Sequence, residues 1–338
     1  MPRQMHDATT HRPLRIGTRA SALARTQTGH VADRLRSLGI DVEIETISTR
    51  GDERRDRPVA AIGGDGVFVR ELEQAMLDGR IDAAVHSLKD MPTAETPGLS
   101  LACVPERAPP FDAVVGRTAA TLEELPAGAV VGTSSIRRIA QLKSLRPDLV
   151  AAPLRGNVDT RLRKLDAGDY DALILAAAGL ERLGLAARIT QMLAPPAFWP
   201  AVAQGAIVVQ MRADDAAAAA LVPLDHAPTH AAVIAERRML GRLAAGCLAP
   251  VGGYARMGED GRLVLGGCVL EIVAATGEVR RLHAEAAGDA AVFTGPGGTV
   301  PSKVSLRAQA ESLGDDVALR LLAAGAEPML AHMRHRLV

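Results

Sequence analysis

Short apolar segments alternate with segments of helical spacing over the first two thirds of the chain, and this alternation limits the possible folds most strongly. In the first part it predicts strands at residues 14–17, 41–47 and 81–85 and helices at residues 22–38 and 67–78, with Ser21 as the cap of the first helix. Apolar residues recur every three or four positions in the predicted helices, whereas the strands alternate or are apolar throughout. This arrangement is typical of an α/β sheet that carries helices on both faces.

The same alternation returns after a segment rich in proline, residues 92–110. It predicts strands at residues 113–115, 130–131, 149–154 and 172–176 and helices at residues 136–145 and 159–166. Two halves of similar size and pattern predict two doubly wound domains with a cleft between them.

The rest of the chain predicts a return to the first domain and then a third, small α/β domain. Residues 194–203 contain three prolines and resemble a hinge, and the apolar run 206–211 would add a strand to the first sheet. A helix at 229–243, strands around 263–273 and a helix at 306–324 follow. The domains are therefore expected at residues 1–105 with 204–225, at 106–203 and at 226–338.

Charge and cysteine content exclude several classes of protein. The 338 residues include 39 basic and 39 acidic side chains, so no global basic field would attract nucleic acid. Residues 1–15 lack an apolar signal core, and no apolar run could span a membrane, which predicts a cytoplasmic protein. Cys103, Cys247 and Cys268 have no metal-ligand spacing, so neither a disulfide framework nor a metal site is expected. Cys103 and Cys268 lie in apolar runs and are predicted to be core residues.

Two turns rich in arginine predict an anion site. Hydroxyl residues at 133–135 follow an apolar strand and can cap the next helix, whose first turn carries Arg137 and Arg138. A capped helix with solvated arginines is the alternative for this turn alone. Residues 155–161 form a second turn with two arginines after the next strand. Because consecutive strands of a parallel sheet end at one edge, both turns should face the edge where such folds bind ligands.

Three other residues could carry chemistry. Lys89 and Asp90 follow a buried strand and are either an acid/base pair or a solvated lysine beside a turn aspartate. Cys247 lies in a loop of small residues after a helix, where it is either an accessible nucleophile or an idle thiol. His86, at the same strand end as Lys89, is predicted to be structural.

Six segments resemble the signatures of the hydroxymethylbilane synthase family, also called porphobilinogen deaminases, in the same order. The resemblance covers about residues 14–250 and is weaker beyond. The segments are Arg15-Ile-Gly-Thr-Arg-Ala-Ser21, Thr49-Arg-Gly-Asp52, Val85-His-Ser-Leu-Lys-Asp90, Gly132-Thr-Ser-Ser-Ile-Arg-Arg138, Arg155-Gly-Asn-Val-Asp-Thr-Arg161 and Gly246-Cys247.

The resemblance implies a fold, a cofactor and an activity. The fold would be three α/β domains, of which the first two resemble type II periplasmic binding proteins. Cys247 would hold a dipyrromethane cofactor through a thioether. Four porphobilinogen units would be added in turn with loss of ammonia, and hydroxymethylbilane would leave by hydrolysis. The resemblance also implies a monomer whose partner is the small-molecule substrate.

The resemblance further assigns roles to individual residues. Asp90 matches the catalytic aspartate of the family. Each pyrrole ring carries an acetate and a propionate, and guanidinium groups bind such carboxylates two oxygens at a time. The residues expected to bind the cofactor besides Cys247 are Arg19, Ser21, Lys89, Thr133, Ser134, Arg137, Arg138, Arg155, Arg161 and Arg182.

The chain departs from the family pattern at five positions. These are Ala61, Asp65, Ala203, Gln210 and Leu248. The first two lie in a charged, glycine-containing segment, residues 50–66, that is predicted to be a mobile loop. The departures leave open a divergent paralogue acting on a modified pyrrole. A separate alternative, from a different class of protein, is a non-catalytic two-lobed binder of a carboxylated small molecule.

Overall fold

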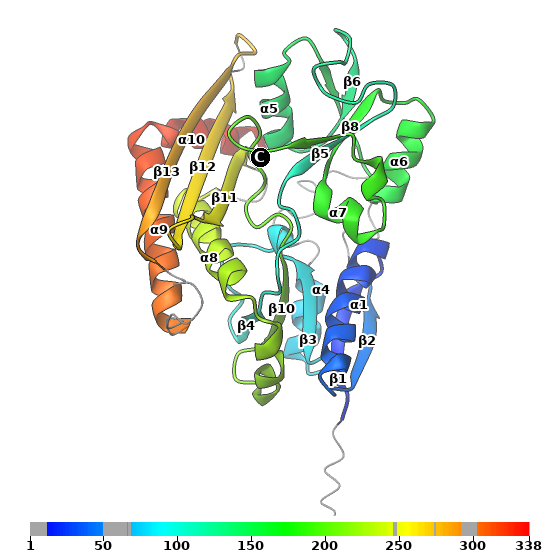
Figure 1. Ribbon diagram of the computed structural model, residues 1–338, viewed down its shortest axis with the longest axis vertical. Coiled ribbons are helices and arrows are strands. Elements are labelled where there is room, and N and C mark those ends of the chain that lie inside the picture. Colours follow the sequence, from blue (N-terminus) through cyan, green and yellow to red (C-terminus); the bar gives the residue numbers. More distant parts are fainter. Residues whose placement is uncertain are drawn as a thin grey trace, which may run out of the picture.

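The computed structural model describes residues 12–49, 66, 69–245, 249–273, 275–291 and 303–337. It contains two five-stranded mixed sheets and one three-stranded antiparallel sheet (Figure 1). Cys247, Leu248 and nearly all of the predicted loop at 50–66 lie outside the described residues.

The first sheet has the strand order β2-β1-β3-β10-β4, in which β10 runs antiparallel to both of its neighbours. Its core lies on both faces: Val31 and Leu35 of one helix pack on Ile16, while Leu72 and Met76 of another pack on the opposite side. The predicted return of the chain to this sheet is confirmed by β10. The elements are β1 (Leu14–Arg19), α1 (Ala22–Ser37), β2 (Val42–Ile47), α4 (Arg70–Leu77), β3 (Ala83–Ser87), a 3-10 turn η1 (Leu88–Asp90), β4 (Leu99–Cys103) and β10 (Ile207–Arg212).

The second sheet repeats this plan with the order β7-β6-β8-β5-β9, and here β5 is the antiparallel strand. In each sheet the antiparallel strand follows a segment that crosses from the other lobe, so two crossovers join the lobes. The elements are β5 (Asp112–Gly116), β6 (Val130–Gly132), α5 (Ile136–Leu145), β7 (Val150–Ala152), α6 (Val158–Asp166), β8 (Ala172–Ala176), α7 (Ala177–Arg182), η2 (Ala186–Arg188) and β9 (Gln191–Leu193).

The third part of the chain is an antiparallel sheet with helices against one face (Figure 1). Its order is β11-β12-β13. The predicted final helix is observed as α9, and a further helix that the sequence analysis did not predict follows it. The elements are η3 (Ala216–Leu224), which precedes this part, then α8 (Ala227–Arg242), β11 (Val251–Met257), β12 (Arg262–Ile272), β13 (Val279–Ala291), α9 (Lys303–Ala323) and α10 (Ala326–Leu337).

The other face of this sheet packs on Trp199, which comes from the second crossover and is 2% exposed. The indole fits only because β11 and β12 have glycine beneath it. A Cβ atom on Gly266 would lie 2.4 Å from Trp199 Cη2, and one on Gly252 would lie 2.5 Å from Trp199 Cβ. The third domain is therefore docked on the crossover through a close aromatic contact.

Replacing Gly266 by alanine is expected to lower the free energy of unfolding by about 1–3 kcal/mol, because the new methyl group overpacks the Trp199 contact. Urea denaturation followed by circular dichroism measures this change. Gly29→Ala is the matched control, since a Cβ there meets nothing within 4 Å and lies in the middle of α1. The control is expected to gain up to about 1 kcal/mol from helix propensity. Equal midpoints for the two variants would contradict the close contact.

Candidate functional site

Several of the predicted site residues follow strand ends of the two lobes and lie within electrostatic range of one another. Lys89 and Asp90 form the 3-10 turn η1 directly after β3, and Arg137 and Arg138 form the first turn of α5 after β6. The charges of Arg138 and Asp112 in the second lobe perturb the pKa of Lys89 in the first. The lobes also touch between α1 and α7, where a Cβ on Gly179 would lie 3.7 Å from Leu23 Cδ2.

Asp112 is the centre of this site, and the sequence analysis did not identify it. Its buried carboxylate accepts from Arg137 Nη1 at 2.7 Å, from Arg138 Nε at 3.0 Å and from Arg138 Nη2 at 2.6 Å. Burial raises the pKa of the Asp112 carboxyl group, but the two guanidiniums outweigh burial and hold the pKa well below its usual value. An acidic residue at the head of an otherwise apolar strand was the available signal.

Arg137 and Arg138 are themselves buried and held by backbone carbonyls. Arg137 Nη1 also donates to the carbonyl of Trp199, and Arg138 Nη1 donates to the carbonyl of Ile174 at 2.8 Å. The sequence analysis predicted that these arginines bind ligand carboxylates or stay solvated. In the structure their guanidinium groups donate to Asp112, so their positive charges are held in fixed positions.

Gln204 joins the turn of the first lobe to the Asp112 cluster. Its Oε1 accepts from Lys89 Nζ at 3.2 Å, and its Nε2 donates to Pro110 O at 2.8 Å and to Asp112 Oδ1 at 3.0 Å. The pKa of Lys89 is lowered to about 8, first by desolvation and then by the charge of Arg138, while Asp90 opposes the shift. Lys89 is thus a lysine whose charge is lost within an accessible pH range.

The hydroxyl residues of the site are used to shape the turns. Ser135 caps α5 by accepting from Arg138 N at 3.5 Å, and Thr133 Oγ1 accepts from Ser135 N at 3.3 Å. Ser134 Oγ both donates to Leu154 O and accepts from Leu154 N at 2.9 Å, which ties the two arginine turns together. In the first lobe Ser21 caps α1, as predicted, and accepts from the backbone N–H three residues later at 3.3 Å.

The second arginine turn faces the same place as the first. Gly156 has a φ of +105°, which glycine alone adopts without strain, and its carbonyl accepts from Arg161 Nε at 2.7 Å. The pKa of Arg161 is lowered to about 10, first by burial and then by Arg138 and Arg155, whereas Asp90 opposes the shift. Arg138, Arg155 and Asp90 therefore lie within electrostatic range of Arg161.

Arg182 and Arg19 approach the site from one further helix and one further strand. Arg182, at the end of α7, donates to Gly205 O at 2.6 Å, and burial lowers its pKa to about 10. Arg19 ends β1, and its charge helps burial to lower the pKa of His86 to about 4. His86 is therefore neutral and buried, in line with the structural role predicted for it.

The site carries more positive than negative charge. A partly buried guanidinium group attracts an anion more strongly than one on the open surface, because the attraction between the two charges is screened less. This arrangement can therefore hold several carboxylates around one half-buried aspartate, Asp90. In the close group the negative side chains are Asp90 and Asp112, and the positive side chains are Lys89, Arg137, Arg138 and Arg161.

Glu236 of α8 fixes the joint between the crossovers and the third sheet. Its carboxylate is fully buried and accepts from Arg107 Nη1 at 2.6 Å, from Ala203 N at 2.6 Å and from Ala255 N at 2.8 Å. Arg107 Nε also donates to Gln204 O at 2.7 Å. Sequence reasoning missed Glu236, although a lone acid within an alanine-rich, apolar helix was a usable signal.

The structure describes the surroundings of two residues that depart from the family pattern, Ala203 and Gln210. Ala203 has a φ of +59°, a left-handed conformation that costs an alanine about 1 kcal/mol, and its N–H is held by Glu236. Gln210 is buried on β10, where its Nε2 donates to Glu73 Oε1 at 3.0 Å.

Other predictions concern metals, membranes and thiols. Among the described residues, no group of three or more His, Cys, Asp and Glu side chains could hold a metal ion. In the same part of the chain, no helix has the length and apolar character needed to cross a membrane. Cys103 and Cys268 are buried, as predicted, and burial raises the pKa of the Cys268 thiol to about 11.

The fold and the site define a class of protein: a two-lobed α/β protein with a third domain, in which cationic side chains gather around a carboxylate. Residues 14–220 match the family model described as porphobilinogen deaminase, dipyromethane cofactor binding domain, and residues 230–323 match porphobilinogen deaminase, C-terminal domain. The chain belongs to the porphobilinogen deaminase family, as its sequence motifs indicated.

Similar curated proteins cover most of the chain. The porphobilinogen deaminase of Roseiflexus castenholzii is 53% identical over 256 residues, which are 75% of this chain and 84% of that protein. The porphobilinogen deaminase of Syntrophobacter fumaroxidans is 44% identical over 324 residues, 95% of this chain and 98% of that protein. Among solved structures, a methionine-binding protein matches 62% of this chain and 89% of its own with 14% identity and a TM-score of 0.41.

Proposed function

We propose that this chain polymerises four porphobilinogen units head to tail, with loss of ammonia, and releases hydroxymethylbilane by hydrolysis. Membership of the family supports the activity. The observation in the structure that supports it best is the excess of buried positive charge around Asp90, because substrate and product carry two carboxylates on every pyrrole ring.

The residues of this site fit a dipyrromethane cofactor. Among the described residues the close group holds more positive than negative side chains, which suits the cofactor's carboxylates, and Asp90 can accept hydrogen bonds from pyrrole N–H groups. The proposed binding residues are Arg19, Ser21, Lys89, Thr133, Ser134, Arg137, Arg138, Arg155, Arg161 and Arg182, with Cys247 as the covalent anchor. When bound, the cofactor supplies the pyrrole carbon to which the first substrate unit is joined.

The residues of the chain have distinct tasks in this reaction. Asp90 stabilises the positive charge that develops on a pyrrole as ammonia leaves, and it accepts the proton lost after the carbon–carbon bond forms. Arg155 and Arg161 hold carboxylates of the pyrrole rings. Arg137 and Arg138, fixed by Asp112, contribute a permanent positive field that needs no reorganisation during the reaction.

The proposal includes the organisation of the protein. The domains are residues 1–105 with 204–225, residues 106–203 and residues 226–338. The two crossovers and the joint at Glu236 support boundaries near 105, 204 and 226. We also propose a cytoplasmic monomer that binds neither nucleic acid nor membrane, for which the zero net charge gives partial support.

Incubation of the purified protein with porphobilinogen tests the activity. The expected result is one hydroxymethylbilane and four ammonia for every four porphobilinogen molecules consumed. A binder of carboxylated molecules would bind porphobilinogen without releasing ammonia. A paralogue specific for a modified pyrrole would leave porphobilinogen unconsumed, and either result would contradict the proposal.

Raising the pH through about 8 is expected to raise the KM for porphobilinogen about tenfold, because Lys89 loses its charge there. The pKa of Lys89 is about 8 in the folded protein, below its ordinary value of 10.5. Between pH 8 and 10.5 the folded protein therefore binds fewer protons than the unfolded chain. The same shift makes Lys89 a destabilising group below pH 8, a penalty that disappears as the pH rises towards 10.5. Steady-state kinetics across this range measures the effect on KM.

The matched variant for this test is Lys89→Arg, which stays charged at every pH used. Its KM should remain nearly constant across pH 8. A rise in KM of the same size in the variant would assign the titration to another group.

A further inference from the structure

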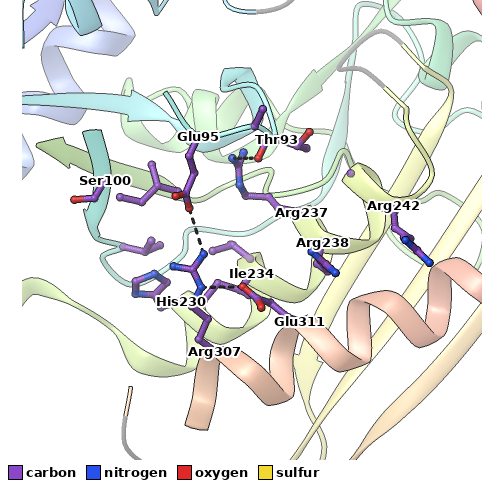
Figure 2. A pocket seen from close by; sticks show the side chains of 15 residues that line it. Thr93, Glu95, Ser100, His230, Ile234, Arg237, Arg238, Arg242, Arg307 and Glu311 are labelled. Carbon is purple, nitrogen blue, oxygen red and sulfur yellow. Dashed lines mark hydrogen bonds and ion pairs between the residues drawn. The ribbon is translucent and has the colours of Figure 1, made fainter. Parts of the chain in front are cut away.

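A cavity is lined by residues that follow the Asp90 turn in the sequence, beginning with Thr93 (Figure 2). It has a volume of about 650 Å³ and lies between residues 93–104 of the first domain and helices α8 and α9 of the third. Its lining includes Thr93, Arg237, Arg238 and Arg307. Arg238 pairs with Asp315 of α9 through two bonds of 2.9 Å, within the third domain. Arg237 instead reaches across to the first domain.

Arg237 holds the backbone immediately after Asp90. Its Nη2 donates to Pro92 O at 2.7 Å and to Thr93 O at 3.4 Å, and its Nη1 donates to Met91 O at 3.3 Å. Figure 2 shows this side chain pointing to Thr93, away from Arg238 and Arg242. A guanidinium that bonds three successive carbonyls fixes the direction of the chain, because its donors lie in one rigid plane.

The Asp90 turn is thereby held at both ends. On its upstream side, Leu88 N donates to Ala206 O at 3.1 Å, and Met91 N closes the turn by donating to Leu88 O at 3.2 Å. On its downstream side the bonds come from Arg237. The close approach continues along α8, where a Cβ on Gly241 would lie 3.7 Å from Thr93 Cβ.

Helix α8 connects this turn with the other parts of the site. Glu236, the residue before Arg237, binds both crossovers, and His226 at the start of the helix donates its N–H to Val104 O at 2.9 Å. Cys247 follows shortly after Arg242, the last residue of α8, in the sequence. A rigid helix thus fixes the Asp90 turn relative to the segment that leads to the proposed cofactor anchor.

We propose that Arg237 is a positioning residue that orients Asp90 from the third domain by holding the carbonyls of residues 91–93. This inference rests on the proposed function, since it concerns the rate of that reaction. A small displacement of a catalytic group reduces the rate of the chemical step far more than it reduces binding.

Kinetics of Arg237→Ala tests this role. The expected result is a kcat lowered about 100-fold, with KM for porphobilinogen within about twofold of the wild type, because no proposed substrate-binding arginine is altered. Arg238→Ala is the control, as it removes the same charge from the next position of α8 and leaves the Asp90 turn untouched. Its kcat should equal that of the wild type. A wild-type protein without activity would instead refute the proposed function and would be seen before any variant is compared.

Rescue separates positioning from a general loss of structure. Because Arg237 lines a cavity, guanidinium ion added below denaturing concentrations should enter and restore part of the kcat of Arg237→Ala, but should not accelerate Arg238→Ala. If Arg237→Ala does not fold, Arg237→Lys, with one cationic donor group, should fold and show an intermediate kcat. An unchanged kcat in both Arg237 variants, an equal loss in Arg238→Ala, or an effect on KM alone would overturn the proposal.

Discussion

Replacing Asp112 by asparagine is expected to lower the free energy of unfolding by about 3–5 kcal/mol, the cost of leaving a buried charge without its partner. In this case Arg137 and Arg138 would both keep their charges beside a neutral amide. Asparagine also presents an N–H₂ group to side chains that have only donors, so at least one contact becomes repulsive. Chemical denaturation at constant pH measures the loss.

Asp166→Asn is the control for this experiment. Asp166 pairs with Arg188 at 2.6 Å, a distance as short as the closest Asp112 contact, but its side chain is 56% exposed. Water screens such a pair, so the expected loss is below about 1 kcal/mol. Similar losses for Asp112→Asn and Asp166→Asn would show that the buried cluster does not hold the second lobe and the crossover together.

Replacing Asp90 by asparagine is expected to lower kcat by a factor of about 10²–10⁴, the usual contribution of a general acid or base. The amide has the same shape but can neither accept a proton nor balance a developing positive charge. Asp90 is half-buried, and within the described part of the chain its side chain makes no hydrogen bond that joins the lobes, so the unfolding midpoint should stay near that of the wild type. Steady-state rates and a denaturation curve on the same preparation measure both quantities.

The outcomes for Asp90→Asn separate chemistry from binding. The KM for porphobilinogen should change little, because the arginines that hold its carboxylates are intact. Asp166→Asn again serves as control and should retain full activity. A kcat within twofold of the wild type would remove Asp90 from the catalytic role.

Several strands were predictable because they depend on local sequence, whereas β9, β11 and β13 were not predicted. Apolar runs such as residues 81–85 and 172–176 appear as β3 and β8, and Ser21 caps α1 as its position suggested. The boundaries moved by up to three residues, as at α9, where a predicted helix at 306–324 is observed at Lys303–Ala323. The second copy of the alternation likewise gave the second lobe correctly.

The interior of the site was not predictable, since it depends on contacts between distant parts of the chain. Arg137 and Arg138 could be recognised as a charged turn, but their partner Asp112 lies 25 residues away from Arg137 and Gln204 lies in the other crossover. Glu236 is similarly 129 residues from Arg107. Sequence periodicity carries no information on such pairs, so the arginines could not be divided into structural and ligand-binding groups before the fold was known.

The glycines under Trp199 show the same limitation. Gly252 and Gly266 lie in strands where their small size has no local reason, because neither has a positive φ. Only the approach of an indole from the crossover explains them.

The mass of the intact protein tests the central claim most directly, by comparing freshly purified wild type with Cys247→Ala. The account expects the wild type to exceed its sequence mass by two porphobilinogen units less the ammonia that each loses, and expects no such addition on the variant. A measured wild-type mass equal to the mass calculated from its sequence, both before and after incubation with porphobilinogen, would contradict a cofactor bound through Cys247. It would also contradict the proposed polymerisation.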